Sequence, residues 1–173
     1  MACWIATLYG GPKRSNQAAV AIEHKIYCFG GCRCIHEESS DQIIETFGVH
    51  VLNTIDYRWK LVETTAFQPN LSEQLLDGSG KPYQAYGEIP PLRVGHTVVV
   101  HQGMVYMWGG CCPDTNMMCS KMYRFDPEQR IWSVIPSASD TPSPRARHTA
   151  VVYNDMMLVY GGIESDRTNG RTM

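Results

Sequence analysis

The sequence predicts an all-β protein built from repeated four-stranded sheets, the arrangement of a β-propeller. Three copies of one pattern support this prediction: an arginine, then a run of apolar residues, then a pair of glycines. The arginine precedes the first glycine by 16 residues in every copy, which are Arg14 with Gly30 and Gly31, Arg93 with Gly109 and Gly110, and Arg145 with Gly161 and Gly162. Polar residues interrupt each apolar run, as a tight turn between two antiparallel strands requires.

A second spacing extends the repeat beyond the glycines. Trp59 follows Asn53 by 6 residues, and Trp132 follows Asp126 by 6 residues. This spacing predicts a third strand, a turn, and a fourth strand with a buried indole. A four-stranded unit that repeats at about 50 residues is typical of a kelch blade. The sequence therefore predicts a kelch-type β-propeller.

The length of the chain predicts an incomplete ring. A propeller closes with about 4–8 blades, whereas 173 residues hold about three kelch blades of about 50 residues each. We therefore expect a fragment, an alternative product or an incomplete gene model of a longer chain. The expected units are an orphan outer strand of the last blade at 1–8, blade 1 at 12–59, an insertion loop at 60–90, blade 2 at 91–136 and an incomplete blade 3 at 144–173.

The composition is that of a soluble globular protein. Hydrophobic residues make up 43% of the chain and the formal net charge is −2, which argues against a direct nucleic-acid partner. No apolar run approaches the roughly 18 residues of a membrane span, so no membrane partner is expected. The seven cysteines follow no secretory signal, so we expect reduced thiols and a location in the cytoplasm or also the nucleus.

Catalytic and metal sites are not predicted. Six of the seven cysteines fall into two clusters, Cys28, Cys32 and Cys34 with His36, and Cys111, Cys112 and Cys119. Neither cluster has the C-x-x-C spacing of a zinc site. The sequence also lacks a nucleophile elbow, a phosphate-binding loop and a metalloprotease helix. We therefore expect no cofactor, no metal and no enzymatic activity; an oxidase of the copper-containing kelch type would need ligands that the sequence does not offer.

Most of the repeated residues are expected to be structural. A catalytic histidine has no reason to recur once per blade, so His96 and His148 are expected to hydrogen-bond backbone groups between blades. The arginines are expected to connect adjacent blades through carbonyl groups. The expected structural set is Arg14, Gly30, Gly31, Trp59, Arg93, His96, Gly109, Gly110, Trp132, Arg145, His148, Gly161 and Gly162.

The positions between each arginine and the histidine step differ from copy to copy. Variable positions in a regular frame are where a repeat protein adapts its binding face. The candidate peptide-binding residues are therefore Asn16, Gly95, Ala146 and Arg147. A guanidinium can bind a carboxylate through two parallel hydrogen bonds, which makes Arg147 the main candidate. The alternative is that Arg147 is a solvated rim charge.

The sequence also resembles one subfamily of kelch proteins, the substrate receptors of cullin-2 RING ubiquitin ligases. This resemblance implies a six-bladed propeller that captures the extreme C-terminus of a client protein, often one that ends in glycine. It also implies that elongin B/C and cullin-2 bind only a full-length form, through a box that this chain lacks. The alternative is a kelch scaffold that bridges chromatin-associated or cytoskeletal proteins without ubiquitin transfer. The resemblance rests on Trp4, Gly10–Arg14, Asn16–Ala21, Tyr27–Gly31, Val49–Asn53 and Arg58–Trp59, and more loosely on the later repeats; the segment 60–90 departs from it.

Overall fold

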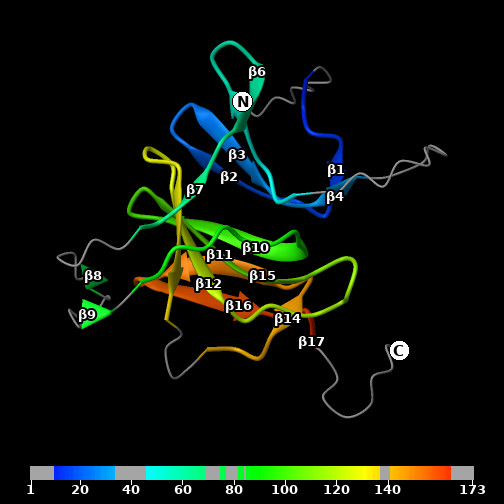
Figure 1. The fold of residues 1–173 in the computed structure, drawn as a ribbon, viewed down its shortest axis with the longest axis vertical. Helices are drawn as coiled ribbons and strands as arrows, with labels where there is room; N and C mark the ends of the chain where they lie inside the picture. The colour runs from blue at the N-terminus through cyan, green and yellow to red at the C-terminus, as the bar shows by residue number, and fades with distance from the viewer. Residues whose placement is uncertain are drawn as a thin grey trace.

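The computed structural model describes residues 10–33, 46–68, 75–76, 82–83, 85–136 and 141–164. All regular secondary structure in these residues is β-strand, arranged as one four-stranded sheet, one five-stranded sheet and four two-stranded pairs. Figure 1 shows their arrangement. The described part of the chain contains no helix with the length and apolar character needed to span a membrane. The outer strand expected at 1–8 lies outside the described residues.

Blade 1 is a four-stranded antiparallel sheet in the order β2-β3-β5-β6. Its turn between β2 and β3 uses Glu23 at a φ of 51°, and the last strand continues three residues past Trp59. Its strands are β2 (Ala18–Ile22), β3 (Lys25–Phe29), β5 (Val49–Asn53) and β6 (Arg58–Val62), preceded and interrupted by the short pair β1 (Arg14–Ser15) and β4 (Cys32–Arg33).

Blade 2 is a five-stranded sheet in the order β10-β11-β12-β13-β7. Four strands are antiparallel, and β7 adds to the outer edge in parallel with β13. The strands are β10 (Val94–His101), β11 (Met104–Cys111), β12 (Met122–Asp126), β13 (Ile131–Ile135) and β7 (Thr65–Ala66).

The segment 60–90 therefore does more than connect two blades. It supplies β7, a small hairpin of β8 (Leu75–Leu76) with β9 (Pro82–Tyr83), and a bridge between Tyr86 and Val134. Glu88 fixes the end of this segment to β12, because its carboxylate accepts hydrogen bonds from Lys121 Nζ and from the Tyr123 hydroxyl, both at 2.5 Å.

Blade 3 is represented by one hairpin, β15 (Thr149–Tyr153) with β16 (Met156–Tyr160). A short pair lies at its start and end, β14 (Arg145–Ala146) with β17 (Ile163–Glu164). The first strands of the three blades, β2, β10 and β15, lie side by side (Figure 1). The segments that lead into these strands therefore meet at one rim.

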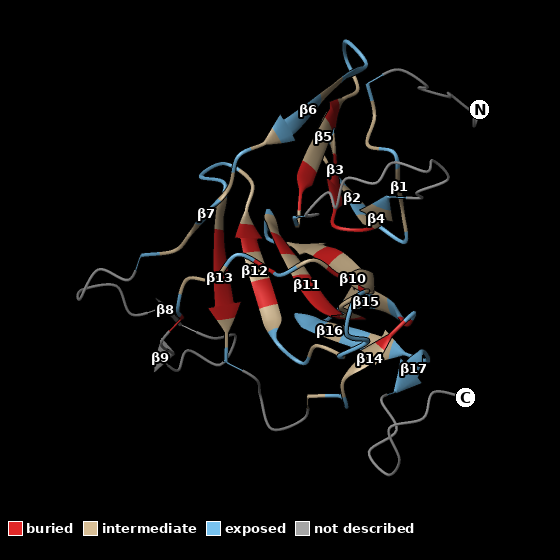
Figure 2. Cartoon of the chain, turned by 45° about the vertical axis from the view of Figure 1, so that its right-hand side comes forward, coloured by how far each residue is buried: buried red, intermediate tan, exposed pale blue. Residues whose placement is uncertain are grey.

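The core lies between blades 1 and 2. Trp132 is fully buried, with its ring centroid 5.7 Å from that of Phe29, 5.7 Å from Phe47 and 4.7 Å from Phe125. Figure 2 shows buried residues concentrated on β3, β5, β11, β12 and β13, whereas β16 and β6 carry mostly exposed ones. Large aromatic side chains dominate the energy of such an interface because each buries about 150–250 Å².

Candidate functional site

Each repeated arginine closes its own blade at the rim. The guanidinium donates to a carbonyl oxygen of the glycine pair of the same blade. These bonds are Arg14 Nη1 to Gly31 O at 2.8 Å, Arg93 Nη1 to Gly109 O at 3.3 Å, and Arg145 Nη1 to Gly161 O at 2.8 Å. The expected link between blades is instead made by an arginine backbone: Arg93 O accepts the Gly31 N–H at 3.1 Å.

The buried side chain of Arg93 shows that the repeated arginine has a structural role. Its side chain is 2% exposed, and its guanidinium lies 4.8 Å from the centroid of the Tyr123 ring. Its Nε also donates to Pro91 O at 3.2 Å. A buried cation needs partners of this kind to offset its loss of hydration. Arg93 is therefore unavailable to a ligand.

The two histidines connect neighbouring blades. His96 Nε2 lies 3.1 Å from Phe29 O in blade 1, and His148 Nε2 lies 2.7 Å from Thr97 Oγ1 in blade 2. Because a carbonyl can only accept, His96 donates through Nε2. Burial, assisted by the positive charge of Arg93, lowers the pKa of His96 to about 4. Burial and the charge of Arg145 also lower the pKa of His148.

In blades 1 and 2 the first glycine of the pair makes room for the next blade's histidine. A Cβ on Gly30 would lie 2.9 Å from His96 Cε1, and a Cβ on Gly109 would lie 2.5 Å from His148 Cε1. Both glycines also have left-handed backbones, with φ values of 59° and 72°. A side chain at either position would therefore collide with the neighbouring blade.

Three of the four candidate binding positions meet at the rim. Asn16, Gly95 and Arg147 occupy the same register position in successive blades, with left-handed φ values of 55°, 66° and 59°. The Gly95 N–H donates to Asn16 O at 3.3 Å, and the Arg147 N–H donates to Gly95 O at 2.7 Å. A continuous line of backbone hydrogen bonds thus crosses all three blades.

Ala146 is not part of this exposed rim. It is 3% exposed and pairs with Ile163 in the short sheet of β14 and β17. Asn16 and Arg147 are both exposed, whereas Gly95 provides only backbone. A Cβ on Gly95 would lie 3.1 Å from Arg147 N and 3.3 Å from Arg147 Cγ. The bare glycine therefore leaves space for the stem of the Arg147 side chain.

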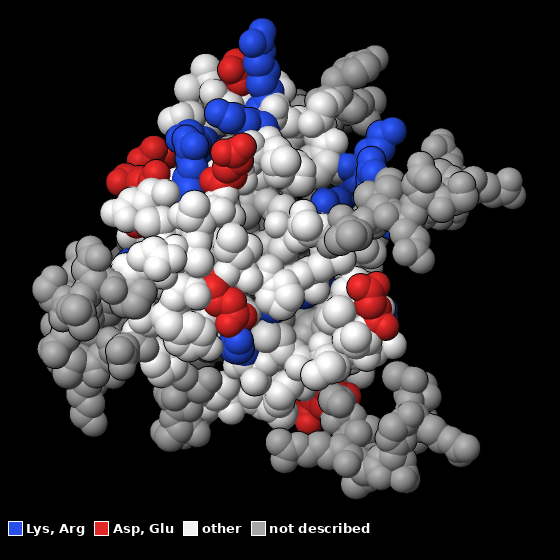
Figure 3. Space-filling view, viewed as in Figure 1, with Lys and Arg blue, Asp and Glu red and all other residues white. Residues whose placement is uncertain are grey.

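Arg147 is the exposed cation of this rim. Within the described part of the chain, no acidic side chain forms an ion pair with it. Arg145, two residues earlier, is instead bound to Gly161 O and paired with Glu164. In the view of Figure 3, basic and acidic side chains intermingle around blade 1 and leave most of the surface uncharged. Among the described acidic residues, therefore, none competes with an anionic ligand for the Arg147 guanidinium.

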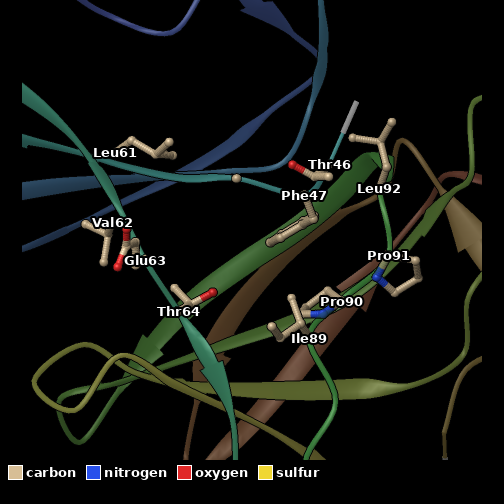
Figure 4. Close-up of a pocket in the computed structure, with 11 residues that line it drawn as sticks. Thr46, Phe47, Leu61, Val62, Glu63, Thr64, Ile89, Pro90, Pro91 and Leu92 are labelled. Atoms are coloured by element: carbon tan, nitrogen blue, oxygen red, sulfur yellow. The ribbon is translucent and has the colours of Figure 1, made fainter. Parts of the chain in front are cut away.

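A separate hollow of about 570 Å³ lies between blade 1 and the segment that leads into β10 (Figure 4). Leu61 and Glu63 line one side of it, Ile89 and Pro91 the other, and Phe47 lies between them. Glu63 is the one charged residue among those that line it. The hollow shares no residue with the rim, and the residues that line it are mostly apolar.

Metal-binding groups do not gather in the described residues: no set of three or more His, Cys, Asp or Glu side chains there could hold an ion. Cys28, Cys32, Cys111, Cys112 and Cys119 are free thiols. Cys34 and His36 lie outside the described residues.

Two kinds of structural contact were not expected from the sequence: hydrogen bonds within turns, and the contacts of Glu88. The side chain of Asp126 accepts the N–H groups of Glu128 and Gln129, both at 2.9 Å, and Asn53 accepts that of Ile55 at 2.9 Å. The 6-residue spacing to each tryptophan was the available signal, because it places both residues at the start of a turn. The Glu88 contacts had no such signal, since they occur once.

The repeat also matches a known protein family. The family model described as "KLHDC2/KLHL20/DRC7 Kelch-repeats domain" matches residues 78–172. The chain belongs to the kelch-repeat family. The described residues therefore form two full kelch blades and the first hairpin of a third.

Individual kelch proteins support the same assignment. Kelch domain-containing protein 3 of Rattus norvegicus and that of Homo sapiens are each 32% identical to the chain over 161 residues, 93% of the chain. The chain spans 38% of the length of each of these relatives. The structure of YjhT superposes with a TM-score of 0.58 at 18% identity, over 88% of this chain and 45% of that one. The predicted all-β, kelch-type propeller class is confirmed.

Proposed function

We propose that this kelch chain is a non-enzymatic recognition module whose rim binds the C-terminal carboxylate of a client protein. The kelch-repeat family is generally one of protein-interaction domains, which supports the general class of function. The observation that supports the specific ligand is Arg147: an exposed guanidinium at the rim, without an acidic partner among the described residues.

A carboxylate loses hydration when it enters a binding site, so it needs cationic or N–H donors in return. Arg147 offers a planar pair of donors, and the exposed amide of Asn16 offers more. Both residues are held in left-handed conformations by the rim hydrogen bonds, so their backbones are already ordered before a ligand binds. Preorganisation of this kind reduces the entropy cost of binding.

We further propose that the module belongs to a substrate receptor of a cullin-2 RING ubiquitin ligase. The resemblance to that subfamily motivates this proposal. Elongin B/C and cullin-2 would bind parts of a full-length protein beyond the 173 residues. A pull-down with a full-length form should recover both; recovery of chromatin or cytoskeletal proteins without either would favour the scaffold function.

The carboxylate proposal has a direct binding test. Fluorescence anisotropy would compare two peptide libraries that end in glycine, one with a free C-terminus and one with an amide. The free carboxylate should bind about 10- to 100-fold more tightly, as expected for one charge-assisted contact. Equal affinities for the two libraries would contradict a carboxylate site.

A further inference from the structure

The side chain of Ser143 is not part of the repeated frame of the blades. Its carbonyl oxygen accepts a hydrogen bond from Arg145 Nε at 3.2 Å, and in blade 2 Pro91 O accepts one from Arg93 Nε at the same distance. Because proline has no hydroxyl group, the frame uses only the carbonyl group at this position. The hydroxyl of Ser143 is therefore an addition that blade 3 carries and blade 2 lacks.

Ser143 lies at an exposed position of the blade. In blade 2 the residue at the same position, Pro91, is exposed as well, although the hairpin of blade 3 follows it. The exposure of this position is therefore found in a blade that has its neighbour, and it does not depend on where blade 3 ends. Ser143 also takes part in no backbone–backbone hydrogen bond with another described residue. An enzyme can therefore reach its hydroxyl group.

Pro144, directly after Ser143, gives the segment the shape of an extended substrate. A proline disfavours the helical conformation in the residue before it and keeps that residue extended. Thr141 and Ser143 are the two positions of the sequence at which a serine or threonine directly precedes a proline. β14 begins at Arg145 and is two residues long, so local opening of this strand presents the segment at a small cost in free energy.

A positive charge already lies beside the Ser143 hydroxyl. Arg145 Nη2 donates to Ser143 Oγ at 2.7 Å. The hydroxyl oxygen is the acceptor in this bond, so its own proton stays available for transfer. The same Nη2 pairs with Glu164, and Nη1 donates to Gly161 O at 2.8 Å. A phosphate group on Ser143 Oγ would lie next to this guanidinium, and hydrogen bonds between two ionised groups are roughly twice as strong as neutral ones.

We propose that Ser143 is a phosphorylation site for a proline-directed protein kinase, and that Arg145 binds the phosphate. In the reaction the Ser143 oxygen attacks the γ-phosphorus of ATP and forms an O–P bond. The bond between that phosphorus and the oxygen of ADP breaks, ADP leaves, and the hydroxyl proton passes to the catalytic base of the kinase. The product carries about 1.5 to 2 negative charges at pH 7 and three acceptor oxygens at this position. This inference does not depend on the ligand proposed for the rim.

Phosphorylation changes the partners of Arg145. Glu164 shares Arg145 Nη2 with Ser143 Oγ and, as an anion, repels a phosphate on that oxygen. The phosphate carries the larger charge, so Arg145 exchanges Glu164 for the phosphate. Arg145 and Glu164 are also opposite each other in the short ladder of β14 and β17. The ion pair that connects these two strands is therefore replaced by a contact with the segment that precedes β14.

The site is tested by incubating the 173-residue chain with ATP and a mitogen-activated protein kinase, followed by mass spectrometry of its peptides. The parent chain should gain a phosphate on Ser143. Ser143→Ala should lose this phosphate, and Pro144→Ala should lose most of the rate although it keeps the hydroxyl. Thr141→Val is the matched control and should keep the phosphate on Ser143. A parent chain without phosphate on Ser143, or a Pro144→Ala variant that reacts at the parent rate, would overturn the proposal.

Phosphorus NMR spectroscopy of the phosphorylated chain tests the role of Arg145. The second pKa of a phosphoserine is about 6. In the folded chain the charge of Arg145 should lower this pKa, because a nearby cation favours the dianion, and the same chain in urea gives the reference value. Glu164→Gln should lower the phosphate pKa further, since the repulsion is removed, whereas Arg58→Gln, at an exposed position of β6, should leave it unchanged. Equal phosphate pKa values in the folded and urea-unfolded chains would overturn the assignment of Arg145.

Discussion

The backbone N–H of Arg147 donates to the carbonyl oxygen of Gly95 at 2.7 Å, across the boundary between two blades. The same glycine leaves space for the Arg147 stem, since a Cβ there would lie 3.3 Å from Arg147 Cγ. The position of the exposed guanidinium therefore depends on a residue 52 positions earlier in the chain.

Gly95→Ala should destabilise the fold and also weaken carboxylate binding. The backbone at a φ of 66° disfavours a side chain, and the new Cβ would lie 3.1 Å from Arg147 N. Strain at such a position costs on the order of 1–3 kcal/mol in the free energy of unfolding. Gly103→Ala is the matched control, because its φ is 76° but nothing lies within 4 Å. Urea denaturation should show a larger loss for Gly95→Ala; equal losses would mean that Arg147 adjusts without cost.

Gly109→Ala should destabilise the chain more than Gly161→Ala, although the two glycines occupy the same register position. A Cβ on Gly109 would meet His148 Cε1 at 2.5 Å and Arg145 O at 2.7 Å, whereas one on Gly161 would meet nothing within 4 Å. Overpacking of this kind costs about 1–3 kcal/mol in the free energy of unfolding. Equal melting temperatures would contradict the interblade role of His148.

Stability should fall as the pH is lowered from about 6.5 to about 4, because of His96. Burial, and then the charge of Arg93, lower its pKa from 6.5 to about 4 in the folded chain. As the pH falls, the His96 imidazole therefore binds a proton in the unfolded chain before it does so in the folded chain, which stabilises the unfolded state. The part of the free energy of unfolding that is present above pH 6.5 is lost on acidification. The loss is on the order of 3 kcal/mol in the free energy of unfolding. His96→Gln should flatten this pH dependence in urea titrations, leaving the contributions of His50 and His148, whose pKa values are also lowered. An unchanged slope would exclude His96 as its source.

Glu88→Ala should loosen the segment 60–90 from blade 2. Burial opposes ionisation of Glu88, but hydrogen bonds from Lys121 and Tyr123 outweigh it and lower the pKa of the carboxyl group. Removal of the carboxylate leaves the partly buried Tyr123 hydroxyl without its acceptor, at a cost of about 1–3 kcal/mol in the free energy of unfolding. Tyr123→Phe combined with Glu88→Ala should cost less than the sum of the two single changes in denaturant titrations. Strict additivity would show that the contact contributes little.

The sequence was sufficient to predict the strands that repeat. The constant spacing from arginine to glycine predicted the β2–β3, β10–β11 and β15–β16 hairpins, because each hairpin repeats the same residues at the same positions. The kelch class followed from that repeat.

Contacts that occur once, or that join backbones, could not be predicted in this way. The parallel addition of β7 to β13 and the Glu88 contacts have no counterpart in another blade. The line from Asn16 through Gly95 to Arg147 uses peptide groups, which every residue possesses, so no side-chain pattern reveals it. The burial of Ala146 depends on the pairing of β14 with β17, two strands too short to show alternation.

The most direct test of the proposed binding site is a double-mutant cycle between Arg147 and the C-terminus of the peptide. Affinities are measured for the parent chain and for Arg147→Ala, each with the free acid and with the amide of one peptide that binds. Arg58→Ala, at an exposed arginine of β6, is the control and should leave both affinities unchanged. If Arg147 binds the carboxylate, each single change costs about 10- to 100-fold in affinity and the second change adds little, with the melting temperature unaltered. Two losses that simply add would show that Arg147 does not contact the carboxylate.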